Sequence, residues 1–263
     1  MHGSSGLAPL AGEGSMQSRL SDWYAESLRL SFFGITGWTQ RSIIREIADV
    51  EPVLMTSQPL MQIHQEAGNL LDGYINVTQQ AGRVDVVLSD QPTRNTMDPA
   101  APGYTPLFRI GTFEKSIEMF DKISMKATSL VTSATRVAYA ITLIRQTESV
   151  REAGACLHRF LPTVDFDPKN DVDLTFQVNR PTRDGKGRFI NRLAKWESIQ
   201  LTTLHIGVGP LPAVPSRPPV YAARIYVDVS TDAENTQPLN DLPELVVELR
   251  SYTLSIAENG DSR

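Results

Sequence analysis

The stretch "RVAYAITLIR", residues 136–145, decides the fold of this chain, because it holds an almost unbroken apolar run between two arginines. A strand of that composition is typical of burial on both faces of a sheet. We therefore place it near the centre of a β-sheet. The elements that precede it also reappear after it in the same order.

Before this strand, hydrophobic periodicity predicts six elements. The spacing is two residues in the expected strands and three or four in the expected helices. Thr39 is the expected cap of the first helix. The order is a strand in 23–34, a helix in 39–50, strands in 60–67, 73–80 and 83–90, and a helix in 112–130.

The order repeats after the central strand. Ser149 and Glu152 stand in capping-box spacing at the start of the next helix, where hydroxyl and carboxylate satisfy free backbone donors reciprocally. The proline-rich segment 208–219 reads as an extended connection between two strands. The expected elements are a helix in 149–161, strands in 172–179, 197–207 and 220–230, and a helix in 242–258.

Both segments thus read strand, helix, three strands, helix, which predicts an α+β fold. We expect a mainly antiparallel sheet with the two long helices packed on one face. The predicted organisation is a flexible tail in residues 1–20, a first half in 21–131 and a second half in 132–263. The halves could also form one continuous domain, and the repeated order fits either an internal duplication or chance.

Composition excludes several classes of protein. The chain has 263 residues with a net charge of −5, which argues against wholesale binding to nucleic acid or anionic lipid. No apolar run reaches the length of a membrane helix, and no signal peptide is recognisable. Cys156 is the only cysteine, so an intrachain disulfide and a cysteine-rich zinc site are excluded. We expect a cytoplasmic protein without a membrane partner.

Residues 179–196, "NRPTRDGKGRFINRLAKW", predict a β-hairpin, because Asp184, Gly185 and Gly187 suit a tight turn. If pairing is centred on Gly185, Asn179 lies opposite Asn191. Between residues 180 and 195 there are six basic residues and one acidic residue, a net charge of +5, which leaves −10 for the rest of the chain. This asymmetry favours a local anion site.

The residue types of the hairpin suit such a site. Arginine offers a planar fork to phosphate or carboxylate, asparagine both donates and accepts, and tryptophan offers a stacking surface. The alternative is an ordinary solvated turn whose arginines pair with acids elsewhere. The candidate anion- or partner-binding residues are Asn179, Arg180, Arg183, Lys186, Arg188, Asn191, Arg192, Lys195 and Trp196.

The segments "FQVNRP" and "INRLAKW" resemble a signature of a sporadically distributed family of uncharacterised bacterial proteins of similar length. The resemblance covers mainly residues 134–200. It implies no activity, cofactor or catalytic residue, but it draws attention to Pro181 together with the asparagines, Arg180, Arg192, Lys195 and Trp196 of the hairpin.

Other candidate sites are weaker. Asp165, Asp167, Asp171 and Asp173 lie close together, but they lack the glycine and glutamate of a calcium-binding hand and also suit a turn. The histidines show no ligand spacing, and Cys156 and His158 point in different directions on a helix. Phosphate-loop, dinucleotide and nucleophile-elbow motifs are absent from the sequence. We therefore expect no catalytic residue, metal site or cofactor.

The leading hypothesis is a non-catalytic binding protein, a subunit of a bacterial complex, whose hairpin (residues 179–196) engages nucleic acid or an acidic protein surface. A second hypothesis is a small-molecule receptor in which Arg180 or Arg192 anchors an anion. A third is a metal-dependent hydrolase that uses Asp165, Asp167, Asp171 or Asp228.

Overall fold

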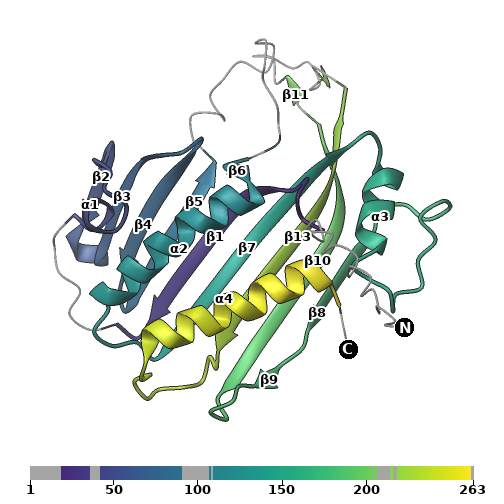
Figure 1. Ribbon diagram of the computed structural model, residues 1–263. Coiled ribbons are helices and arrows are strands. Elements are labelled where there is room, and N and C mark those ends of the chain that lie inside the picture. Colours follow the sequence, from purple (N-terminus) through teal and green to yellow (C-terminus); the bar gives the residue numbers. More distant parts are fainter. Residues whose placement is uncertain are drawn as a thin grey trace, which may run out of the picture.

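The computed structural model describes residues 19–35, 42–90, 107, 109–202, 204–205, 214–215 and 218–261. Within these residues the chain forms an antiparallel sheet of eleven strands and four α-helices that pack against it (Figure 1). The predicted α+β class is confirmed. Nearly all of the predicted tail lies outside the described residues.

The first part of the chain contributes β1 (Tyr24–Phe33), α1 (Ile43–Ala48), β2 (Leu54–Gln58), the 3₁₀ helix η1 (Pro59–Met61), β3 (Ile63–Leu70), β4 (Gly73–Gln80), β5 (Arg83–Asp90), β6 (Gly111–Thr112) and α2 (Phe113–Leu130). The second part contributes β7 (Arg136–Thr147), α3 (Val150–His158), β8 (Thr175–Asn179), β9 (Thr182–Arg183), β10 (Phe189–Leu201), β11 (Leu204–His205), β12 (Val214–Pro215), β13 (Val220–Thr231) and α4 (Leu242–Asn259). The strand order is β2-β3-β4-β5-β1-β7-β13-β10-β8, with β6 beside β1 and β9 beside β10.

Strand β7 lies in the middle of the sheet, as its apolar run predicts. It pairs with β1 on one side and with β13 on the other. Tyr139 and Ile141 point into the main core, whereas Ala138 and Ala140 are buried on the opposite face. The small alanines leave room on that face for longer side chains from the neighbouring strands.

Helices α2 and α4 lie side by side across one face of the sheet (Figure 1). Their apolar residues recur at helical spacing, so each helix turns a stripe toward the strands. Phe120 and Ile123 of α2 and Leu245 and Leu249 of α4 belong to the same core. Of the helices in the described residues, none has the length and hydropathy required to span a membrane.

Two short helices complete this layer, and their starts differ in part from expectation. In α3, Ser149 Oγ accepts a hydrogen bond from Glu152 N (3.2 Å), but the Glu152 carboxylate accepts from Glu148 N (2.6 Å) instead of the capping residue. The first helix begins only at Ile43, and the expected cap Thr39 lies outside the described residues. There the buried Glu66 of β3 accepts from Ile44 N at 3.1 Å and thereby satisfies a free backbone donor.

The opposite face of the sheet carries polar side chains that pair across the strands. Arg29 of β1 binds Asp228 of β13 at 2.6 Å, and Tyr226 donates to the same carboxylate at 2.9 Å. Arg224 contacts Glu26 at 2.7 Å. Such cross-strand pairs suit a face that no helix of the described residues covers.

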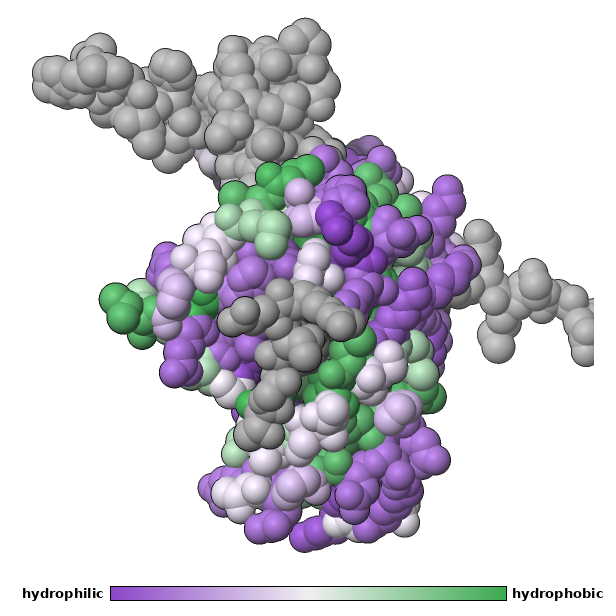
Figure 2. All heavy atoms as spheres, turned by 90° about the vertical axis from the view of Figure 1, so that its left-hand side faces the viewer, coloured by the Kyte–Doolittle hydropathy of each residue, from purple (hydrophilic) through white to green (hydrophobic). Residues whose placement is uncertain are grey.

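The edge strand β2 was not predicted. The sequence indicated one strand in 60–67, whereas the structure has β2, then η1, and then β3. Most of β2 is exposed on both faces, so it lacks the alternation that identifies a half-buried strand. Figure 2 views this edge and shows apolar side chains among polar ones. Exposed apolar residues near it are Val53, Leu54, Met55, Leu60 and Met61.

Candidate functional site

Residues 179–196 form the predicted hairpin, but its register differs from the prediction. Asn179 lies opposite Leu193, and Thr182 lies opposite Ile190. The pairing is therefore centred on Lys186 instead of Gly185. A shift of two residues keeps every side chain on its expected face, because the strand period is two. The outgoing strand of the hairpin, predicted in 190–196, and the first part of the strand predicted in 197–207 are one continuous strand, β10, which ends at Leu201.

The turn explains this register. Asp184 N donates to Arg188 O and Gly187 N donates to Asp184 O, each at 3.0 Å. Gly187 has φ of 81°, which suits the left-handed position that ends a three-residue hairpin loop. The Asp184 carboxylate accepts from the backbone N–H groups of Lys186 and Arg188 at 2.9 and 2.7 Å. The single acid of the hairpin thus organises the turn.

The expectation that the remaining surface leaves the hairpin cations unneutralised is wrong. Four of the six contact carboxylates, and α4 and the second residue after its end supply the acids for three of them. Lys186 lies 2.8 Å from Glu244, and Arg188 lies 2.9 Å from Glu248. Arg188 also pairs with Asp184, and Lys195 pairs with Glu197.

Arg180 has the most enclosed partner. Its Nε and Nη2 donate to the two carboxylate oxygens of Asp261 at 2.5 and 2.7 Å, a bidentate pair. The side chain of Asp261 is 2% exposed, and its backbone N–H donates to Phe160 O at 2.8 Å. The hydrogen bond from Arg180 to Asp261 raises the pKa of the guanidinium. Arg180 therefore fixes the segment that follows α4.

The other two arginines bind backbone carbonyls. Arg183 donates to Gly187 O at 2.7 Å near the tip of the hairpin, and Arg192 donates to Arg180 O at 2.8 Å near its base. Within the described residues, neither has a carboxylate partner. Of these two, only Arg192 lies on the face that α4 covers.

The repeated Asn-Arg pair separates into two roles, because consecutive side chains of a strand point to opposite faces. Asn179 Nδ2 donates to Asn191 Oδ1 at 3.3 Å, and Asn179 Oδ1 accepts from Arg192 N at 3.2 Å. The asparagines thus support the hairpin. The arginines point toward the helix layer, where they line a cavity.

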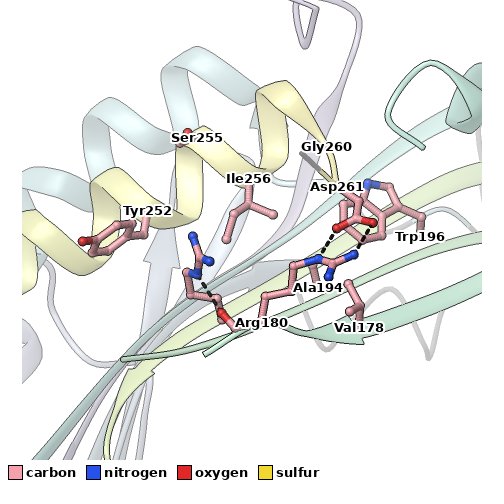
Figure 3. A pocket seen from close by; sticks show the side chains of 10 residues that line it. Val178, Arg180, Ala194, Trp196, Tyr252, Ser255, Ile256, Gly260 and Asp261 are labelled. Atoms are coloured by element: carbon pink, nitrogen blue, oxygen red, sulfur yellow. Dashed lines mark hydrogen bonds and ion pairs between the residues drawn. The ribbon is translucent and has the colours of Figure 1, made fainter. Parts of the chain in front are cut away.

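We call this cavity the arginine pocket (Figure 3). It lies between the hairpin and the C-terminal half of α4, and its volume is about 70 Å³. Arg180 points toward Asp261 in Figure 3, and Tyr252 and Ile256 approach from the helix. The lining residues are Val178, Arg180, Arg192, Ala194, Trp196, Tyr252, Ser255, Ile256, Gly260 and Asp261.

Trp196 does not provide the expected exposed stacking surface. It is fully buried and packs on Phe176 with ring centroids 6.0 Å apart. Trp196 lines the arginine pocket, and its indole N–H has no hydrogen-bond partner among the described residues. A buried donor without a partner is rare in native proteins. This indole and Arg192 are therefore donors of pocket-lining residues that have capacity for an additional acceptor.

The surroundings of Tyr252 in the arginine pocket change the pKa of its hydroxyl group. Burial raises the pKa of Tyr252, and the negative charges of Glu248 and Asp184 raise it further, while Arg192 opposes them. The Tyr252 hydroxyl is therefore protonated at neutral pH. Tyr252 and Asp261 were not identified from the sequence, although the i, i+4 acids Glu244 and Glu248 are a signal that α4 complements a basic surface.

The predicted acidic cluster has structural partners. Asp167 accepts from Lys169 N at 2.9 Å and from Asn170 Nδ2 at 2.6 Å, and Asp171 accepts from Asp167 N at 2.8 Å. Asp228 lies elsewhere, on the polar face of the sheet. In the part of the chain that the structure describes, no group of three or more histidine, cysteine or acidic side chains is placed to hold a metal ion.

Cys156 lies on α3 and is partly buried. Burial raises the pKa of its thiol, and the charges of Arg145 and Arg159 only partly oppose this. A reactive cysteine requires a lowered pKa. The surroundings of Cys156 therefore favour an unreactive structural cysteine over a nucleophile.

Neither the protein-family models nor the curated proteins that were searched contain a match to this chain. The resemblance to a sporadically distributed bacterial family stays a prediction.

Proposed function

We propose that this chain is a non-catalytic binding protein that receives one anionic group of a partner in the arginine pocket. The observation that carries the proposal is Arg192. Its guanidinium lines the pocket and has only a carbonyl as a hydrogen-bond partner among the described residues. A carboxylate there would gain a charge-assisted hydrogen bond.

The second open donor supports the same ligand chemistry. The unpaired indole N–H of Trp196 requires an acceptor, and a carboxylate has two oxygens that accept. Asp261 supplies one carboxylate, which Arg180 holds with both donors. The acceptor for the Trp196 indole N–H must therefore come from a group other than the Arg180–Asp261 pair.

The size of the pocket limits what enters. A volume of about 70 Å³ is far below the roughly 300–1,000 Å³ of small-molecule sites. One carboxylate fits, whereas a complete metabolite does not. The proposed occupant is thus an acidic side chain or a chain end of a protein partner, as expected for a subunit of an assembly.

Nucleic acid is the less favoured partner. Affinity for a phosphate backbone grows with the number of phosphates that cations neutralise. Lys186, Arg188, Lys195 and Arg180 already contact carboxylates, so each would exchange one anion for another. Arg183 and Arg192 lack a carboxylate partner among the described residues, but only Arg192 lines the arginine pocket, which favours a single anionic group there.

A receptor for a small anion is the second candidate, at the tip of the hairpin. A cavity of about 360 Å³ lies there between Lys186, Arg188, Phe189 and the segment 231–241. This volume suits a small molecule. Its cations are paired, however, so a ligand would have to displace Glu244 or Glu248.

The two-unit organisation belongs to the proposal as well. In the sheet, β5-β1 on one side corresponds to β13-β7 on the other, and β4 corresponds to β10. A helix follows β1 and β7, and a long helix follows β5 and β13. This correspondence supports an internal duplication with β1 and β7 at its centre.

The test uses the indole N–H resonance of Trp196 in nuclear magnetic resonance spectra, assigned through Trp196→Phe. Acetate is the probe, titrated at constant ionic strength against chloride. We expect a saturable shift in the original chain and in Arg183→Gln, and its loss in Arg192→Gln. The two variants are matched, because each removes a guanidinium that binds a hairpin carbonyl.

Two results would overturn the proposal. One is an acetate shift that survives in Arg192→Gln. The other is the absence of any shift combined with salt-dependent binding of a fluorescein-labelled oligonucleotide that Arg183→Gln weakens as much as Arg192→Gln. The second result would establish the nucleic-acid alternative. Loss of an acetate response only in Lys186→Gln would establish the site at the hairpin tip.

A further inference from the structure

A second cavity lies on the other side of α4. It opens between α2 and α4, above Tyr139 of the central strand β7, and its volume is about 310 Å³. That volume reaches the lower end of the range for small-molecule sites. We call it the hydroxyl cavity; its lining residues are Asp121, Ser124, Met125, Tyr139, Val246, Val247 and Arg250.

Two hydroxyl groups in the wall of this cavity make no well-formed hydrogen bond with the described residues. Tyr139 is fully buried and Ser124 is 2% exposed, and the Asp121 carboxylate interacts with the Tyr139 hydroxyl. Leaving a buried polar group unsatisfied costs about 1–3 kcal/mol. Two such groups beside one cavity therefore reduce the stability of the fold. Phenylalanine and alanine in place of Tyr139 and Ser124 would avoid this cost.

The charged residues at the cavity neutralise one another. Arg250 Nε donates to Asp121 Oδ1 at 2.6 Å. Burial raises the pKa of Tyr139, and the nearby Asp121 carboxylate raises it further, so the hydroxyl stays protonated and able to donate. An anionic ligand would face Asp121, and a cationic ligand would face Arg250. The cavity therefore favours a neutral molecule.

The entrance is apolar and adaptable. Met125 of α2 is 44% exposed and Val247 of α4 is 51% exposed, although both are large hydrophobic residues. Methionine adjusts its shape with little cost because its side chain is unbranched and flexible. An apolar ligand would cover both side chains while a rotation of Met125 admits it to the hydroxyl groups.

We propose that the hydroxyl cavity binds a small, neutral, mostly apolar molecule with one oxygen, an alcohol or a ketone, that hydrogen-bonds with Tyr139 and Ser124. This site is separate from the arginine pocket, and it does not depend on the function proposed there. An ordered water is the competing occupant. A buried water needs two to four polar partners, which Ser124, Tyr139 and the Asp121–Arg250 pair would supply, so titration with organic probes distinguishes the two occupants.

The test reads the ¹³C-labelled methyl group of Met125, assigned through Met125→Leu, during titration with benzyl alcohol and with acetophenone. Benzoate is the charged control. We expect saturable shifts with both neutral probes and none with benzoate. Tyr139→Phe and Ser124→Ala should each weaken binding about 2- to 10-fold, the effect of one hydrogen bond. Val247→Trp should abolish binding by closing the entrance.

Tyr226→Phe is the matched control, because it removes a tyrosine hydroxyl on the opposite face of the sheet. It should leave both titrations unchanged. The proposal is overturned if neither neutral probe shifts the Met125 methyl group, which would mean that the cavity holds solvent only. It is equally overturned if the Tyr139→Phe/Ser124→Ala double variant binds both probes as well as the original chain.

Discussion

The polar groups on the two flanks of helix α4 differ in how many of them have interaction partners. On the hairpin flank, Glu244 and Glu248 meet Lys186 and Arg188, and Asp261 beyond the helix meets Arg180. On the α2 flank, one ion pair lies beside two buried hydroxyl groups that make no well-formed hydrogen bond with the described residues. The densely charged flank is thus largely satisfied, whereas the apolar flank is not.

This difference indicates that a hydrogen-bond donor with capacity for another acceptor identifies a candidate binding site better than a high density of charged residues does. Ion pairs with exposed members contribute only about 0–1 kcal/mol each, so they add little stability and mainly select how surfaces meet. Arg192 and the indole of Trp196 are the exceptions on the hairpin flank. Tyr139 and Ser124 are their counterparts on the α2 flank.

The largest expected loss of stability comes from a substitution at Gly260. This variant tests whether the backbone that follows α4 must lie close to the backbone that follows α3. Gly260 has φ of 73°, and a Cβ atom there would overlap the Phe160 carbonyl oxygen. Gly260→Ala should lower the free energy of unfolding by roughly 2–6 kcal/mol, from backbone strain and overpacking of about 1–3 kcal/mol each. Urea unfolding followed by circular dichroism measures it.

Gly187→Ala separates the two contributions. Gly187 also has positive φ, 81°, but apart from its chain neighbours no atom of the described residues lies within 4 Å of the place that a Cβ atom would occupy. This variant should show the strain alone and remain clearly more stable than Gly260→Ala. Equal losses in both variants would contradict the close approach of α4 and α3.

A pair of tyrosine variants tests the contrast between unsatisfied and satisfied hydroxyl groups. Tyr139→Phe removes a buried hydroxyl that makes no well-formed hydrogen bond with the described residues, so the free energy of unfolding should rise by about 1 kcal/mol. Tyr226→Phe removes a hydroxyl that donates to Asp228 at 2.9 Å, so it should fall by about 1 kcal/mol. Effects of the same sign in thermal and urea unfolding would show that Tyr139 is satisfied in solution.

Much of the fold was predictable because it depends on local periodicity. The apolar run of β7 and the helical spacing of α2 and α4 each identify an element without reference to the rest of the chain. Strand β2 was missed because its side chains are exposed on both faces, so burial imposes no alternation. The hairpin register was two residues off because the turn is organised by the Asp184 side chain as well as by its glycines.

The candidate site was predictable only in part. The excess of positive charge in residues 180–195 is a property of the local sequence, but its neutralisation is not. Lys186 and Glu244 are 58 residues apart, and only the packing of α4 beside the hairpin brings them together. The unpaired hydroxyl of Tyr139 is equally invisible in the sequence, because tyrosines in a central strand usually find a partner.

The smallest expected effect concerns the acid that organises the hairpin turn. Burial alone would raise the pKa of Asp184, but hydrogen bonds from Arg188 and Lys186 N and the charge of Arg188 lower it overall. A carboxyl group whose pKa is lower in the folded state stabilises the protein above its unfolded pKa, about 3.9, and loses that contribution as the pH falls through the folded value. Asp184→Asn should therefore cost on the order of 1 kcal/mol at pH 7.

That cost should shrink as the pH falls below about 4, because the original carboxyl group then becomes protonated and resembles the amide. Urea unfolding of both proteins from neutral to acidic pH measures the difference, in which the other titrating acids largely cancel. A difference that stays constant with pH would mean that shape, and not charge, makes Asp184 important. The turn would then form through its glycines alone, and the hairpin flank would owe less to its ion pairs than the contrast between the two flanks implies.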